Sequence, residues 1–562
     1  MGGMNLRIGI VASLVAVAGL TAGCGEEEMV ERNQLIIGIS QFPEGFHPTL
    51  FSHVAQSLVL GASRRPLTTY DAEWQLICML CEALPDVADG TAREWISSEG
   101  EEGWELDYKI RDDAVWADGT PVTTRDVLFT WEIGRHPESG VAASELYTDI
   151  EKIEAHDDRR FTLFNKKRSC DYQGINDFEL IPAHIDEANF AEPREYRTRS
   201  AFETDTTNPG LYMGPYMVTA LEFGASITLE RNPNWWGKTP RFDRVIFKII
   251  ENTAALEANL LSGDIDYIAG EDGITLDQAL AFEAKHGEDY NVVFRSGLIY
   301  EHIDLRQEDP ILSDIRVRRA LAYGADREGI AEQLFKGHQP VAHGAINPLD
   351  EVYYDGVPKY GFDPVRAAEL LDEAGWTELR DGVRHNAAGD PLTIEIMTTA
   401  GNRVRETVEQ ILQSMWRDIG VDLRIRNEPA RVFFGQTTRQ RRFHHMAMYA
   451  WVSAPKSIPL STLHSTMIPT VENNYSGQNY PGYASDEMDE VIDRLQVECA
   501  EATQTELWNR LQTLYAEDLP VLPLYFRANV FVMPHWLKGV EPTGHQYPST
   551  LWIENWHVAE DE

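Results

Sequence analysis

Short apolar runs and amphipathic stripes alternate along the chain. Residues 35–39 form a compact apolar run typical of a buried strand, and residues 421–426 alternate strictly, as a half-buried strand does. Apolar residues recur at helical spacing after Asp363-Pro364, a pair that suits an N-cap and a first helical turn. Gly375 follows at the position of a left-handed C-terminal cap. Strands that alternate with capped helices predict a mixed α/β fold.

The first apolar run, residues 8–20, is too short to span a bilayer, which needs about 20 residues. It suits the apolar region of a signal peptide. The small residues that lead into Cys24 resemble the lipobox of bacterial lipoproteins, although Thr21 stands where those proteins usually carry Leu. We predict a signal peptide over 1–24 and lipidation of Cys24. Residues 25–32 would form an acidic tether between the lipid and the folded body, and we expect the lipid alone to anchor the protein to the membrane. An ordinary secretory signal with an incidental cysteine is the alternative.

The chain is strongly acidic. Its 562 residues include 49 Lys and Arg against 90 Asp and Glu, a formal net charge of −41. Such a chain would be repelled by phosphate backbones, which excludes nucleic acid as a partner. The apolar content of 43% supplies enough side chains for real cores, which excludes a wholly disordered chain. For an exported body the surplus of acid indicates a solvated anionic coat.

Four cysteines remain if Cys24 is lipidated: Cys78, Cys81, Cys170 and Cys499. In an exported protein we expect structural disulfides, with free buried thiols as the alternative. Four cysteines allow three pairings, and the sequence does not choose among them. The apolar residues around the single C-x-x-C motif argue against a redox centre, and the lack of a second motif argues against zinc.

Several motifs follow one another in an order typical of one protein family. The longest is residues 108–123, YKIRDDAVWADGTPVT, which continues to Trp131. Further blocks are 181–184 (IPAH), 214–216 (GPY), 231–236 (RNPNWW), 261–266 (LSGDID), 314–321 (DIRVRRAL), 362–376 and 519–525 (LPVLPLY). From about residue 33 to 530 the chain resembles the extracytoplasmic solute-binding proteins of ABC importers, in the large peptide/nickel-type family 5.

The resemblance implies a two-lobed α/β clamshell of the periplasmic-binding-protein type, with an extra α/β subdomain in the first lobe. We expect lobe I at 33–75, 215–298 and 520–562, the subdomain at 76–214, and lobe II at 299–519. The implied partners are a peptide or peptide-like small solute and the ABC permease and ATPase complex. The protein itself is expected to act as a monomer.

The family also implies where ligand is held. In members of this family, the cleft is lined by a segment in which Asp follows Trp by three residues. In the peptide-binding members, the carboxylate of this Asp captures the α-ammonium of the peptide. This chain has Trp451 but carries Ala454 at the position of the acid. A buried ammonium needs a partner, so another acid supplies the charge or the ligand has no free α-ammonium there. The candidate ligand-binding residues are Trp451, Val452, Ser453, Ala454, Phe51, Ser52 and His53.

Other interpretations stay open at this stage. Trp451 could be a core side chain, and His53 a surface or hinge histidine. Adjacent His444 and His445 point to opposite faces of an extended segment, so we expect no metal site, and no cofactor. A metallophore or other non-peptide solute is the alternative ligand, and ligand sensing without transport the alternative role. The chain has no G-x-S-x-G, H-E-x-x-H or P-loop motif, so we assign no catalytic residue; an exported hydrolase is the rival class.

Overall fold

The computed structural model describes residues 32–559 except 52, 53, 142, 143, 251, 430, 431, 473, 474 and 476. The predicted signal peptide, the lipidation site Cys24 and most of the acidic tether therefore lie outside the described residues. The same holds for the candidate ligand residues Ser52 and His53. Within the described part of the chain, no helix has the length and apolar character needed to cross a membrane.

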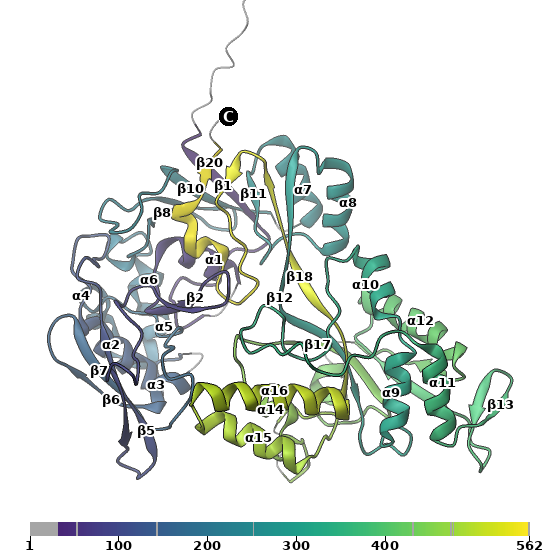
Figure 1. Ribbon diagram of the computed structural model, residues 1–562. Helices are drawn as coiled ribbons and strands as arrows, with labels where there is room; N and C mark the ends of the chain where they lie inside the picture. Colours follow the sequence, from purple (N-terminus) through teal and green to yellow (C-terminus); the bar gives the residue numbers. More distant parts are fainter. Residues whose placement is uncertain are drawn as a thin grey trace, which may run out of the picture.

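One ten-stranded mixed sheet runs through the molecule (Figure 1), in the order β16-β15-β17-β12-β18-β11-β1-β10-β9-β8. The predicted apolar strand is β1, and the predicted alternating strand is β16. The strand bounds are β1 (Gln34–Ile39), β8 (Tyr216–Glu222), β9 (Ser226–Arg231), β10 (Arg244–Ile249), β11 (Tyr267–Ile268), β12 (Tyr290–Leu305), β15 (Thr393–Met397), β16 (Asp422–Ile425), β17 (Met446–Val452) and β18 (Val521–Pro534).

The two long strands β12 and β18 belong to two separate hydrophobic cores. Their residues 290–294 and 530–533 pack with the side chains of β1, β8, β9 and β10 and of the helices beside them. At the other end, Ile303 and Leu305 of β12 and residues 522–525 of β18 pack with β15, β16 and β17. We call the first half lobe I and the second half lobe II. The residue limits given above for the lobes stay a prediction.

Helices cover both halves of the sheet. Lobe I carries α1 (Val54–Ser63), α7 (Thr253–Ser262) and α8 (Leu276–His286), and lobe II carries α9 (Ile315–Tyr323), α10 (Arg327–Phe335), α11 (Pro364–Glu373), α12 (Arg403–Asp418), α15 (Asp486–Val497) and α16 (Glu501–Asp518). The predicted capped helix is α11. The Asp363 carboxylate accepts a hydrogen bond from the backbone N–H of Arg366 at 2.9 Å, and Gly375 follows the helix with a left-handed φ of 93°.

A second, four-stranded antiparallel sheet has its own core and forms the body that we call the subdomain. It consists of β4 (Ala92–Ile96), β5 (Glu102–Lys109), β7 (Arg160–Asn165) and β6 (Ile150–Ala155), with α2 (Thr124–Arg135) and α3 (Glu145–Asp149). Buried Asp126 joins two of the sequence motifs here. Its carboxylate accepts hydrogen bonds from the backbone N–H groups of Thr123 at 2.8 Å and Ala183 at 2.9 Å.

The structure selects one of the three possible cysteine pairings. Cys78 is bonded to Cys81, and Cys170 is bonded to Cys499. The first disulfide closes a tight local loop beside β3 (Leu76–Cys78), whereas the second joins residues 329 positions apart in the sequence. The expectation of structural disulfides is met by both pairs.

A buried ion group ties β12, β18 and α12 together. Three residues of β12, 297–299, stand opposite the single residue Arg527 of β18, so the pairing of the two strands is irregular there. The Arg527 Nε donates to the carboxylate of Glu301 at 2.9 Å, and the Arg405 Nε of α12 donates to its other oxygen at 2.5 Å. Because Glu301 has no exposed surface, its charge depends on these two guanidinium groups.

We expect Glu301→Gln to lower the free energy of unfolding by about 3–5 kcal/mol, because it leaves Arg405 buried without its counter-charge. Denaturant unfolding followed by circular dichroism measures the change. As a matched control, Glu154→Gln removes an exposed partner of Lys152 and should change stability by less than about 1 kcal/mol. Equal stability of Glu301→Gln and the parent protein would contradict the role given to this group.

Candidate functional site

Trp451 lies near the end of β17, next to the irregular pairing of β12 and β18. It pairs with Tyr300 of β12, and two residues later the backbone N–H of Ser453 donates to the Leu298 carbonyl at 3.2 Å. The candidate segment 451–454 thus passes directly beside the place where the strands run from one lobe to the other.

Aromatic side chains surround Trp451 on lobe II. Its ring centroid is 5.4 Å from that of Tyr449, 5.9 Å from that of Tyr480 and 6.4 Å from that of His302. Trp451 is only half-buried, so it is neither a fully packed core residue nor a free surface side chain. Phe434 is 44% exposed, and its ring centroid lies 5.9 Å from that of Tyr449. We call Trp451, Tyr449, Tyr480 and Phe434 the aromatic wall.

Of the remaining candidates of this segment, Val452 ends β17, and a turn begins at Ala454. Val452 is 68% exposed, and the Ala454 carbonyl accepts a hydrogen bond from the backbone N–H of Ser457 at 3.1 Å. A carboxylate reaches the turn from elsewhere in the chain, because buried Asp350 accepts a hydrogen bond from the backbone N–H of Lys456 at 2.8 Å. Position 454 therefore lacks an acid of its own, while another segment brings an acid close to it.

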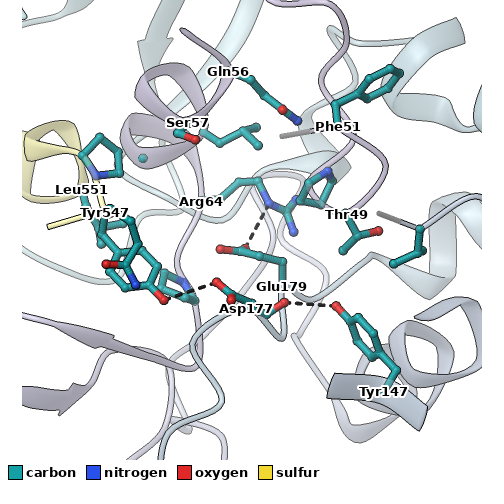
Figure 2. A pocket seen from close by; sticks show the side chains of 17 residues that line it. Thr49, Phe51, Gln56, Ser57, Arg64, Tyr147, Asp177, Glu179, Tyr547 and Leu551 are labelled. Carbon is teal, nitrogen blue, oxygen red and sulfur yellow. Dashed lines mark hydrogen bonds and ion pairs between the residues drawn. The ribbon is translucent and has the colours of Figure 1, made fainter. Parts of the chain in front are cut away.

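A cavity of about 320 Å³ lies on the lobe I side (Figure 2). Its walls come from α1, from the loop that precedes α1, from the subdomain, and from the segment 546–551 near the end of the chain. Phe51, one of the candidates from the sequence, lines it. The cavity is therefore formed by segments that are hundreds of residues apart, which no local motif would reveal.

Arg64 is the basic side chain among the described residues that line this cavity. It is 2% exposed, its Nη1 donates to the Leu211 carbonyl at 2.6 Å, and its other Nη donates to the Leu180 carbonyl. Its Nε lies 3.8 Å from the carboxylate of Glu179 (Figure 2). Desolvation raises the pKa of Glu179, and Arg64 partly opposes this shift. Arg64 thus joins the end of α1 to the subdomain.

Asp177 presents the freer carboxylate. Tyr547 donates its hydroxyl to the Asp177 carboxylate at 3.3 Å, and Tyr147 donates to the Asp177 backbone carbonyl at 3.1 Å. Desolvation raises the pKa of Asp177, whereas the hydrogen bond from Tyr547 lowers it. Figure 2 shows Asp177 near the middle of the view, with Tyr547 on its left and Tyr147 on its right. A carboxylate that accepts one hydrogen bond from a phenol is suited to receive an ammonium or guanidinium group as well.

Tyr70 contacts the wall of the cavity and interacts electrostatically with acids of lobe II. The Tyr70 ring stacks on Tyr547 with centroids 6.4 Å apart. Desolvation raises the pKa of Tyr70, and the charges of Asp171, Asp350 and Glu351 raise it further. Asp350 is the residue that contacts the turn after Trp451. Tyr70 therefore contacts one wall residue of the cavity, Tyr547, and its pKa responds to acids of lobe II.

The histidine pair does not gather a metal site in the structure. The rings of His444 and His445 are 6.4 Å apart, and the Nδ1 of His445 accepts a hydrogen bond from the backbone N–H of Glu395 at 3.2 Å. In the part of the chain that the structure describes, no three His, Cys, Asp or Glu side chains are grouped as metal ligands would be. Sequence reasoning missed Phe434, Tyr480 and Asp177, since none of them lies in a recognisable motif.

Comparison with known proteins adds independent evidence. The model of the bacterial extracellular solute-binding proteins, family 5 (middle part), matches residues 86–466. The oligopeptide-binding protein AppA of Bacillus subtilis is 24% identical over 502 residues, which cover 88% of this chain and 86% of that protein.

Solved structures agree with this assignment. An oligopeptide-binding protein of Thermus thermophilus, solved with a pentapeptide, is 28% identical and has a TM-score of 0.65 over 94% of this chain and 96% of that one. NikZ of Campylobacter jejuni, solved with Ni(L-His), is 21% identical with a TM-score of 0.67 over 94% and 99%, and it bears on the fold alone. The expected two-lobed α/β clamshell is confirmed. With 381 of its residues inside the family match, this chain belongs to the bacterial extracellular solute-binding proteins of family 5.

Proposed function

We propose that this protein captures a peptide, or a similar organic solute, between lobes I and II and delivers it to the permease and ATPase of an ABC importer. The observation that carries the proposal is the half-buried Trp451 beside the strands that pass between the lobes, in a chain of the solute-binding family. The pentapeptide bound by the Thermus thermophilus relative supports a peptide as the ligand. The family is one of solute-binding proteins, and we assign no catalytic residue.

The aromatic wall would hold the apolar parts of such a ligand. Exposed faces of Trp451 and Phe434 offer flat surfaces that bind side chains of many shapes, and the indole N–H supplies one directed donor. Backbone groups of the turn at Ser453 and Ala454 lie next to this surface. A site of this kind selects for peptide-like geometry more than for particular side chains.

The cavity on lobe I would receive a positively charged group of the ligand. The terminal nitrogens of Arg64 donate to backbone carbonyls and its Nε faces Glu179, so an incoming ammonium would pair with Asp177 rather than with Glu179. This supplies the counter-charge that Ala454 does not. A volume of about 320 Å³ is at the lower end of the range for ligand sites, which favours a short peptide or one residue of a longer peptide in the cavity.

The location follows from the family and from the N-terminal sequence. The family is extracellular, and residues 1–24 have the pattern of an export signal that ends at a lipobox cysteine. We infer that Cys24 carries the lipid, that residues 25–32 tether the folded body, and that the protein works as a monomer beside its permease. Mass spectrometry of the mature N-terminus tests the lipid directly.

The ligand is identified by mass spectrometry of what the protein releases on denaturation after gentle purification. We expect peptide masses. Recovery of a metal chelate instead would overturn the peptide part of the proposal and keep solute binding. Conversion of an added peptide to smaller products during incubation would contradict the binding role and support the hydrolase.

Trp451→Ala should weaken binding of the recovered ligand at least about tenfold, a loss of about 1.4 kcal/mol, because it removes the stacking surface. Isothermal titration calorimetry measures the affinity, and circular dichroism checks that the fold is intact. Phe223→Ala removes an aromatic side chain that is 82% exposed on lobe I and serves as the control. Wild-type affinity of the Trp451 variant would show that this side chain does not contact the ligand.

Asp177→Asn should weaken binding of the tripeptide Ala-Ala-Ala about tenfold, because the ammonium loses a charged partner. Binding of the N-acetylated tripeptide should change little, since it carries no ammonium. Asp112→Asn, an exposed acid of the subdomain, is the control. If the substitution affects both peptides equally, Asp177 does not recognise the amino group.

A further inference from the structure

The disulfide between Cys170 and Cys499 connects two bodies that have separate hydrophobic cores. Cys170 follows β7 of the subdomain, and Cys499 lies in the short connection between α15 and α16 of lobe II. The Cys170 sulfur is 3.6 Å from the Gln496 carbonyl at the end of α15. Cys499 also packs against the core of the subdomain. The bond is thus a bridge between lobes, unlike the local loop closed by Cys78 and Cys81.

This bridge is far from the strands that connect the lobes. β12 and β18 pass from one core to the other at residues 297–299, opposite Arg527. Figure 1 shows one end of α16 beside the subdomain, away from the crossing of β12 and β18. In hinge closure the chain rotates about the connecting strands, and the points far from them move most. A bond at such a point removes the largest displacement.

Charged groups of lobe II act on the residue next to Cys170. Desolvation raises the pKa of Asp171 to about 6. Lys456 of lobe II lowers this pKa, and the carboxylates of Asp350 and Glu351 raise it with smaller effects. The ammonium of Lys456 also pairs with Glu351. The charges at this interface are therefore of both signs, and the disulfide is what joins its two sides covalently.

We infer that the Cys170–Cys499 disulfide is a tether that limits how far lobe II separates from the subdomain, so that ligand enters and leaves through a partly opened cleft. Three covalent connections among the described residues then join the lobes, namely β12, β18 and the bridge. The tether still permits small rotations and movement of the loops that carry the cysteines. It does not depend on which solute the protein binds.

The test compares two double variants of the full chain. Cys170→Ser with Cys499→Ser removes the tether, and Cys78→Ser with Cys81→Ser removes the local disulfide as the matched control. In ligand-free protein, small-angle X-ray scattering should give a larger radius of gyration for the first variant only. Amide exchange in residues 446–457 should become at least about tenfold faster in that variant. Scattering and exchange equal to those of the parent would overturn the inference.

A second measurement keeps the test valid if the tether variant does not fold. In the Cys78→Ser, Cys81→Ser background the bridge is the one remaining disulfide among the described cysteines. Dithiothreitol reduces it to two thiols, supplying two electrons and two protons and becoming the cyclic disulfide itself. Expansion on reduction, with near-ultraviolet circular dichroism unchanged, supports the tether. Reduced protein with native dichroism and unchanged scattering contradicts it.

Discussion

The antiparallel pairing of β12 with β18 is the constraint on which the rest of this molecule depends. Each strand is long enough to contribute side chains to the cores of both lobes. The hydrogen bonds between the two strands therefore extend from one lobe into the other. Where the ladder is interrupted, the backbone comes very close to a second segment. A Cβ at Gly297 would lie 2.8 Å from the Gly544 carbonyl, so glycine is required there. The Glu301 group beside this interruption joins both strands to α12.

The strong negative charge of the chain is a second constraint on how its surfaces meet. With a net charge of −41, surfaces that approach each other carry mostly acidic side chains. Between the subdomain and lobe II, the disulfide of Cys170 and Cys499 joins the surfaces covalently, and Lys456 of lobe II balances part of the acidic charge by pairing with Glu351. A cationic group of the ligand would add to this balance, which would couple ligand binding to lobe closure.

Some residues of the candidate site could be predicted from the sequence, and others could not. Trp451 was identified because it lies in a segment with a family pattern, and the structure surrounds it with other aromatic rings. Phe434 and Tyr480 join it from segments with no motif, so only packing brings them to the wall. Asp177 is one of 90 acids in the chain, and nothing in its local sequence distinguishes it. Its environment between Tyr147 and Tyr547 does.

The sequence by itself determined the mixed α/β class, the capped helix after Asp363 and the family, because hydrophobic periodicity, capping and collinear motifs are local properties of the chain. It also determined that position 454 carries no acid. Only the tertiary structure decided which cysteines pair and which segments enclose the cavity. The reason is that both depend on residues hundreds of positions apart, such as Cys170 with Cys499 and α1 with Tyr547. Long-range proximity arises from how the cores pack, and no short stretch of sequence records it.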